Sequence, residues 1–179
     1  MKRAAYLLFI ALASGACASS PPPSAPAQAT SASASSPPDA LEVKLAEVAR
    51  VHGAPGPWAV AGYRMSEYAL QKLGLPRGSF DLQVTHHTPQ QVKYSCIADG
   101  AQAYSGASPG KLNLTLVEAK PEEVVTEYRN KKTGQKILLK PAASFQTRYA
   151  DTPRNKAHDL GREVMLLPAD QVFEEVPST

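Results

Sequence analysis

Cysteine is scarce in this sequence, because the 179 residues include only Cys17 and Cys96. These two residues fall in segments with different predicted fates, which excludes a scaffold held together by disulfides. The net charge is also small. Lys2 and Arg3 lie in a predicted leader, and without them 17 basic residues remain against 16 acidic ones. Because the two kinds of charge are nearly balanced, the chain lacks the excess of basic residues that is typical of nucleic-acid-binding proteins, so we expect no nucleic-acid partner.

The first 17 residues are typical of an export signal. A positively charged start precedes an apolar run over residues 4–13, which is too short to cross a bilayer as a stable helix. The run ends in Ser14-Gly15-Ala16-Cys17, which resembles a bacterial lipobox, whose cysteine thiol accepts a diacylglyceryl group. We therefore expect a lipoprotein signal peptide over residues 1–17 and attachment to a membrane through a lipid on Cys17.

Ordinary secretion is the alternative, with Ala16-Cys17-Ala18 as a cleavage site of small residues. Both interpretations export the protein. Ala18 stands where an Asp often signals retention at the inner membrane, so we expect the outer membrane, facing the periplasm, or else a soluble secreted or periplasmic protein. Residues 18–38 are almost wholly Ser, Ala and Pro and lack the apolar mass that ordering requires, which predicts a disordered tether.

Residues 39–179 are expected to form one domain, because roughly 140 residues suit a single core. A first helix is predicted from Asp39, a suitable N-cap, to His52, which lies on the buried stripe of that helix. A second helix follows Pro57 and ends at Gly74.

Residues 80–85 alternate between apolar and polar side chains, which predicts a half-buried strand whose inward phase continues to His86. Ser95 is the expected N-cap of a helix that runs to Tyr104, so Cys96 is predicted in its first turn. The remaining chain is strand-rich, and the elements together predict an α+β domain. We expect strands at 112–118, 124–129 and 135–139, helices near 142–149 and 156–165, and a turn over 168–173.

Two groups of residues occur in the order and spacing of a known family. One comprises Cys96-Ile97-Ala98-Asp99-Gly100-Ala101-Gln102, Gly106 and Gly110-Lys111-Leu112-Asn113-Leu114, and the other comprises His52-Gly53 and Gly62-Tyr63-Arg64. On these residues, over about 48–116, the chain resembles the FmdE family, which takes its name from a component of formylmethanofuran dehydrogenase. The resemblance implies helices packed on a mixed, largely antiparallel sheet, similar to the second domain of glyceraldehyde-phosphate dehydrogenases. It also implies a tendency to form homodimers and no particular activity.

The chain departs from the family in residues that could bind metal. The first family motif usually reads His-Gly-His-x-Cys-Pro-Gly. Here Ala54 replaces the second His, Gly56 replaces the Cys and Trp58 replaces the last Gly, while Pro57 is kept. Many relatives also carry a C-terminal zinc finger, but no cysteine follows Cys96 in this sequence. Any metal site must therefore be built within the core of the domain.

Four residues are predicted to share one pocket: His52, His86, Cys96 and, one helical turn further on, Asp99. His52, His86 and Cys96 with a carboxylate nearby would suit zinc, with an open position for water in a catalytic site. Alternatively, both histidines are hydrogen-bonded structural residues and Cys96 is a small buried hydrophobe. A third possibility is thiol catalysis by Cys96, although the charge of Asp99 would disfavour the thiolate.

Arg64 is a further candidate for binding an anionic ligand, although pairing with Glu67 or Asp99 would explain it equally well. The sequence leaves three functions open. The first is a lipid-anchored domain that binds a metal ion or a small ligand in the predicted pocket. The second is a metal-dependent enzyme that uses the same pocket, and the third is a dimer or partner-interaction module whose pocket has decayed.

Overall fold

The structure, a computed structural model, describes residues 39–177, so the predicted signal peptide (1–17) and tether (18–38) lie outside the described residues. The helices are α1 (Ala40–His52), α2 (Pro57–Leu73), α3 (Val92–Ser105), α4 (Ala143–Arg148) and α5 (Ala157–Leu166). The strands are β1 (Leu82–Thr88), β2 (Leu114–Glu118), β3 (Val125–Asn130), β4 (Lys136–Pro141) and β5 (Phe173–Val176). Short 3₁₀ turns lie at Pro109–Lys111, Pro121–Glu123, Arg154–Lys156 and Ala169–Gln171. Among residues 39–177, no helix combines the length and hydrophobicity needed to cross a membrane.

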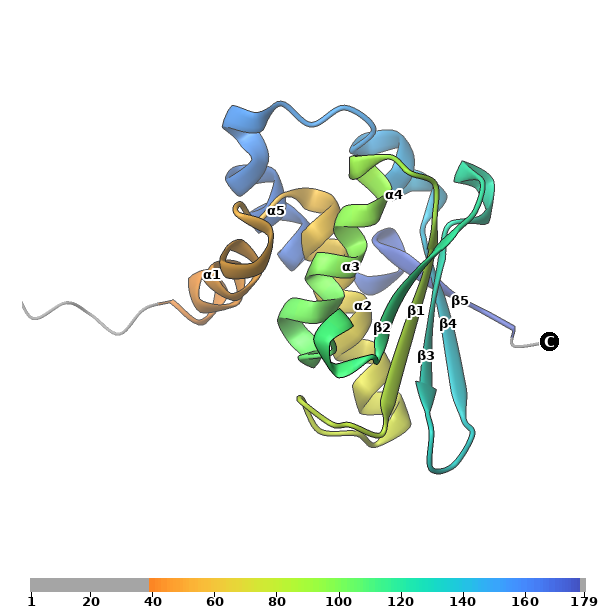
Figure 1. The fold of residues 1–179 in the computed structure, drawn as a ribbon. Coiled ribbons are helices and arrows are strands. Elements are labelled where there is room, and N and C mark those ends of the chain that lie inside the picture. Colours follow the sequence, from red (N-terminus) through yellow and green to blue (C-terminus); the bar gives the residue numbers. More distant parts are fainter. Residues whose placement is uncertain (1–38, 178–179) are drawn as a thin grey trace, which may run out of the picture. The chain divides into compact units, whose positions relative to one another are not determined.

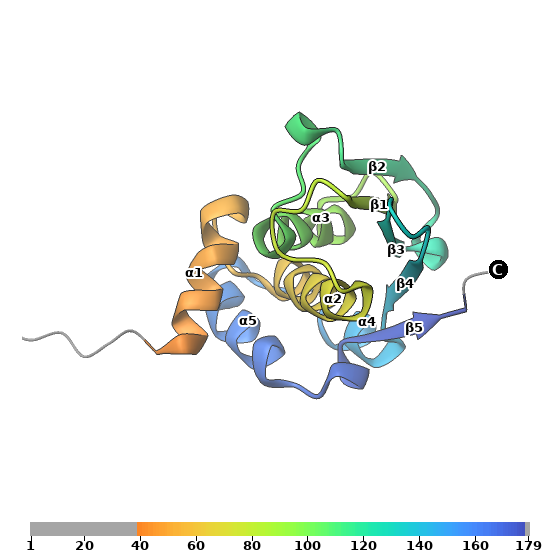
Figure 2. The same cartoon turned by 90° about the horizontal axis from the view of Figure 1, so that it is seen from below.

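The helices lie on one side of the sheet (Figure 1). In the view from below (Figure 2), α2 and α3 lie next to the sheet, and α1 and α5 lie farther from it. The central position of α2 explains its composition, because 12 of its 17 residues are buried and the helix is apolar well beyond a single stripe. The structure confirms the predicted α+β fold.

The ends of the first two helices agree with the sequence prediction. The Asp39 side chain accepts a hydrogen bond from the backbone N–H of Leu41, and Gly53 ends α1 with a φ of 89°. Gly74 ends α2 in the left-handed conformation, with a φ of 61°. The loop between the two helices therefore consists of four residues, 53–56.

The two helices next to the sheet pack unusually closely because each has a glycine at the contact. A Cβ on Gly62 in α2 would collide with the backbone carbonyl of Ile97 in α3. A Cβ on Gly100 in α3 would in turn collide with the carbonyl of Ala59 in α2. Both glycines belong to the two motif groups that the chain shares with the family, so these motifs encode the α2–α3 contact.

The strands form one mixed sheet in the order β2-β1-β3-β4-β5. Only the β1–β2 pair is parallel, and the other three pairs are antiparallel, as the family resemblance implies. In β1, Leu82, Val84, His86 and Thr88 are buried, which confirms the inward phase predicted for His86. His86 lies opposite Thr126 of β3 in the sheet register.

Two local predictions were wrong, and one strand was missed. The helix expected to begin at Cys96 begins four residues earlier, at Val92, and Ser95 donates its hydroxyl to the Val92 carbonyl instead of capping the helix. Phe80 is 67% exposed because it lies in the turn before β1, outside the alternating pattern. The turn predicted over 168–173 is confirmed by the 3₁₀ turn Ala169–Gln171, but the strand that follows it, β5, was not predicted and pairs with β4.

Candidate functional site

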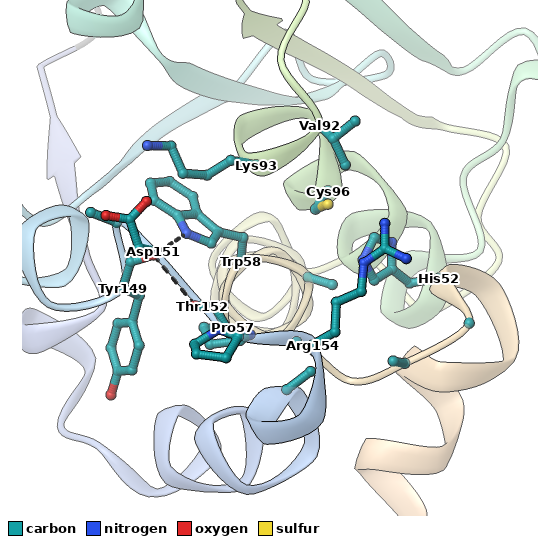
Figure 3. Close-up of a pocket in the computed structure, with 17 residues that line it drawn as sticks. His52, Pro57, Trp58, Val92, Lys93, Cys96, Tyr149, Asp151, Thr152 and Arg154 are labelled. Carbon is teal, nitrogen blue, oxygen red and sulfur yellow. Dashed lines mark hydrogen bonds between the residues drawn. The ribbon is translucent and has the colours of Figure 1, made fainter.

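A cavity of about 830 Å³ opens where three parts of the chain meet (Figure 3). They are the loop between α1 and α2, the first turn of α2 with the first two turns of α3, and residues 149–157, which lead into α5. The α5 side is fixed by close packing, because a Cβ on Gly161 would collide with the carbonyl of Pro55 in the loop. Most of the lining is apolar or backbone. The lining residues with an ionisable side chain, apart from Tyr149, are His52, Lys93, Cys96, Asp151 and Arg154.

His52 and Asp99 form a pair at the edge of the cavity. His52 is the last residue of α1, and its Nδ1 lies 2.8 Å from Oδ2 of Asp99 in α3. The His52 side chain is 22% exposed and the Asp99 side chain 46%. His52 lines the cavity, whereas Asp99 does not. The carboxylate thus orients the imidazole, and only the second ring nitrogen of His52 remains for a ligand.

Cys96 also lines the cavity, but its thiol is poorly suited to act as a nucleophile. Because α3 begins at Val92, Cys96 lies in the second helical turn and is farther from the helix N-terminus than predicted. Burial, together with the charge of Asp99, raises the pKa of the Cys96 thiol to about 11. The thiolate is therefore scarce at neutral pH, which argues against thiol catalysis.

His86 does not join this site, contrary to the predicted convergence. Its Nδ1 lies 2.9 Å from the Thr126 hydroxyl and its Nε2 lies 3.1 Å from the Tyr94 carbonyl oxygen. The side chain is fully buried, and burial lowers the pKa of His86 to about 4. The inward phase of β1 places this imidazole beneath α3, where both nitrogens are occupied. His86 is thus a hydrogen-bonded interior residue outside the cavity lining.

Arg64 also lies outside the cavity lining. Its Nη1 donates to the backbone carbonyl of Val164 in α5 at 2.7 Å. The partners suggested by the sequence are engaged elsewhere, because Glu67 pairs with Lys44 and Asp99 pairs with His52. Burial lowers the pKa of the Arg64 guanidinium. This arginine therefore connects α2 to α5 in the present arrangement.

The predicted zinc ligands are not brought together. Within residues 39–177, no three His, Cys, Asp or Glu side chains are grouped closely enough to hold a metal ion. The separation of His86 from the cavity is the reason, because it removes the third member of the set with His52 and Cys96. The sequence had already lost two potential ligands at Ala54 and Gly56.

Comparison with known families identifies the domain. The chain matches the family model described as "FmdE, Molybdenum formylmethanofuran dehydrogenase operon" over residues 51–174, which is more than half of its length. The chain belongs to the FmdE family. The match confirms the resemblance inferred from the motifs and runs from the end of α1 to β5. No match to an individual curated protein was found. Dimer formation and zinc binding stay predictions.

The departures of this FmdE domain from the family motif lie on the cavity wall, because Ala54, Gly56 and Trp58 all line it. The Trp58 Nε1–H donates to the backbone carbonyl of Tyr149 at 2.8 Å. The Trp58 ring also packs edge-on against Phe145, with ring centroids 5.0 Å apart. Trp58 therefore holds the segment before α5 against the start of α2 and shapes the cavity.

Sequence reasoning missed three charged residues of the wall: Lys93, Asp151 and Arg154. No spacing pattern links them. Lys93 lies in the first turn of α3, which was predicted to begin after it, and the other two lie in an irregular connection between α4 and α5. The one sequence feature that could have pointed to this wall is Trp58, the single tryptophan of the chain, which stands where the family usually has glycine.

Proposed function

We propose that this protein is an envelope lipoprotein whose FmdE domain binds a small organic ligand in the cavity at the start of α2. The observation that carries the proposal is the cavity, since its volume of about 830 Å³ is within the range of roughly 300–1,000 Å³ that is usual for small-molecule sites. Its position gives further support, because residues of the family motif between His52 and Trp58 form part of the wall.

The chemistry of the wall favours an organic ligand over a zinc ion held by protein side chains alone. Zinc sites usually use three protein ligands when catalytic and four when structural. The wall offers one imidazole, from His52, one thiol, from Cys96, and one carboxylate, from Asp151, but among residues 39–177 no three such side chains are grouped closely enough to hold a metal ion. In contrast, the apolar surfaces of Pro57, Trp58 and Val92 suit the hydrocarbon part of an organic molecule.

The membrane anchor is supported by the lipobox-like residues that end in Cys17. We expect the full-length protein to incorporate labelled palmitate and to fractionate with membranes when it is expressed in a bacterium. Cys17→Ser should abolish both properties. Cys96→Ser is the matched control and should retain them, since it removes the other cysteine of the chain. Labelling that persists in Cys17→Ser would contradict the anchor.

Ligand binding can be tested with Trp58 as an intrinsic probe, because it is the single tryptophan and it lines the cavity. We expect members of a library of small organic molecules to change Trp58 emission in a saturable manner. Ala157→Phe places a larger side chain in the wall and should weaken this binding by about tenfold or more. Ala143→Phe, at an exposed alanine of α4 outside the lining, is the control and should bind normally. Equal binding by both variants, or no saturable binding, would refute the proposal.

A further inference from the structure

Two cationic side chains line the cavity without a carboxylate partner. Lys93 and Arg154 have no Asp or Glu oxygen within 4.0 Å among residues 39–177, whereas Arg77, Arg148 and Arg162 do. The Lys93 ammonium instead lies 4.8 Å from the centroid of the Tyr94 ring. Neither cation is therefore paired directly with a carboxylate of residues 39–177, and both can pair with an anion that enters the cavity.

The two helices that begin at the cavity add backbone donors to the same wall. Neither α2 nor α3 has a side-chain hydrogen bond at its N-cap or an acidic residue in its first turn, whereas α1 has both. Residues 56–59 and 92–93 of these first turns line the cavity. The first amides of a helix lack intrahelical acceptors and carry partial positive charge, so they reinforce the effect of the two cationic side chains.

The charges are not spread evenly around the cavity. In Figure 3, Arg154 and His52 lie on one side of Trp58, and Lys93 and Asp151 lie on the other. The carboxylate of Asp151 reduces the positive potential on its side. An anion is therefore favoured on the side of Arg154, where His52 keeps one ring nitrogen free of Asp99.

We propose that the ligand is an organic oxyanion, a carboxylate or a phosphate ester on an apolar body. This inference rests on the proposed ligand-binding function and specifies the class of ligand. The oxyanion lies between Arg154 and the first turn of α2, beside His52, and the apolar body lies against Trp58. Inorganic phosphate alone does not fit this description, since it would fill a small part of about 830 Å³ and leave the apolar wall uncovered.

The test compares matched acids and neutral analogues by isothermal titration calorimetry on the full chain carrying Cys17→Ser. The pairs are benzoate with benzamide, 2-naphthoate with 2-naphthamide, and phenyl phosphate with phenol, and inorganic phosphate is a separate arm. We expect at least one anion to bind about tenfold or more tighter than its neutral analogue, and inorganic phosphate to show no saturable binding. The tighter of the carboxylate and phosphate arms identifies the head group.

Variants locate the oxyanion. Arg154→Met should weaken binding of the anions by about tenfold and leave the neutral analogues unchanged, whereas Lys93→Met should have a smaller effect. Lys156→Met removes a nearby cation that does not line the cavity and should bind like the parent chain. If acids and neutral analogues bind equally, or if Arg154→Met and Lys156→Met behave alike, this inference is overturned and the proposed function stands. If no compound binds, both are overturned.

Discussion

His86 and His52 lie in two regions of the domain that surround the same type of side chain with different partners and different exposure to solvent. In the interior between β1 and α3, His86 is fully buried and both of its ring nitrogens have neutral oxygen partners. At the cavity, His52 is partly exposed and one of its nitrogens bonds to the carboxylate of Asp99. The closed interior satisfies every polar atom of its histidine, whereas the cavity leaves one nitrogen for an external partner.

An inward-facing position on a helix or strand does not show whether the side chain reaches a cavity. Both histidines lie on the inner phase of their elements, yet only His52 reaches the cavity. Whether a histidine is available to a ligand depends on how many of its ring nitrogens lack a hydrogen-bond partner. The partners are distant in sequence, such as Asp99 for His52 and Thr126 for His86. Experiments that treat the two regions in parallel can test this distinction.

The largest expected difference in stability between the two regions comes from replacing one glycine by alanine in each of them. Gly100→Ala directs a Cβ into the carbonyl of Ala59 and must separate α2 from α3, so we expect a loss of about 3 kcal/mol or more in the free energy of unfolding. Gly56→Ala meets nothing within 4 Å and has a compatible φ of −69°, so it should cost less than about 1 kcal/mol. Urea unfolding of both variants measures the difference, and equal losses would show that the interior is no tighter than the cavity loop.

His86 should make the stability of the interior depend on pH. Because burial lowers its pKa in the folded chain to about 4 from the ordinary value of 6.5, the unfolded chain binds the proton more readily between these values. The stabilisation is therefore complete above pH ~6.5 and is lost as the pH falls towards ~4, by up to about 3 kcal/mol. Urea unfolding at a series of pH values measures this loss.

The control for this prediction separates His86 from the acidic residues that titrate in the same range. His86→Gln should lower stability at pH 7, because one ring hydrogen bond is lost, but its stability should fall less steeply towards pH 4 than that of the parent chain. Parallel pH profiles for the parent chain and His86→Gln would show that this histidine is not held neutral by the interior.

Cys96 lies at the boundary of the two regions, because it is buried and also lines the cavity. With its pKa raised to about 11, the thiol should react with iodoacetamide at pH 8 about a hundredfold more slowly than it does in the urea-unfolded chain. The measurement uses Cys17→Ser, so that Cys96 is the single thiol. Similar rates in the folded and unfolded states would indicate that the cavity exposes and activates the sulfur.

The fold was largely predictable because its signals are local. Asp39, Gly53 and Gly74 mark helix ends by cap chemistry that needs no distant partner, and the alternation in β1 fixed the inward side of His86. The start of α3 was predicted four residues late because Ser95 resembles an N-cap, whereas the actual cap position, Gln91, makes no side-chain cap bond. β5 was not predicted from the sequence, because this strand is defined by its pairing with β4 and not by a pattern in its own residues.

The site was only partly predictable because it is assembled from segments that are distant in sequence. His52, Cys96 and Asp99 belong to family motifs, and the structure pairs His52 with Asp99 and places His52 and Cys96 on the wall of one cavity. Lys93 and Arg154 carry no motif, and they line one cavity only because the start of α3 and the segment before α5 both lie at the loop before α2. His86 was included wrongly, since the alternation of a strand shows which face a side chain is on but not what lies above it.

The smallest effect on stability should come from breaking the His52–Asp99 pair, which sharpens the contrast with His86. The two side chains are 22% and 46% exposed, and a pair of this kind is weakened by solvent, so we expect a coupling free energy of about 0.5 kcal/mol between His52→Gln and Asp99→Asn in a double-mutant cycle. Ligand binding should respond more strongly, because Asp99 orients the imidazole that faces the cavity. A coupling of several kcal/mol would mean that His52 is a structural residue like His86, and the cavity would then lose the histidine assigned to ligand binding.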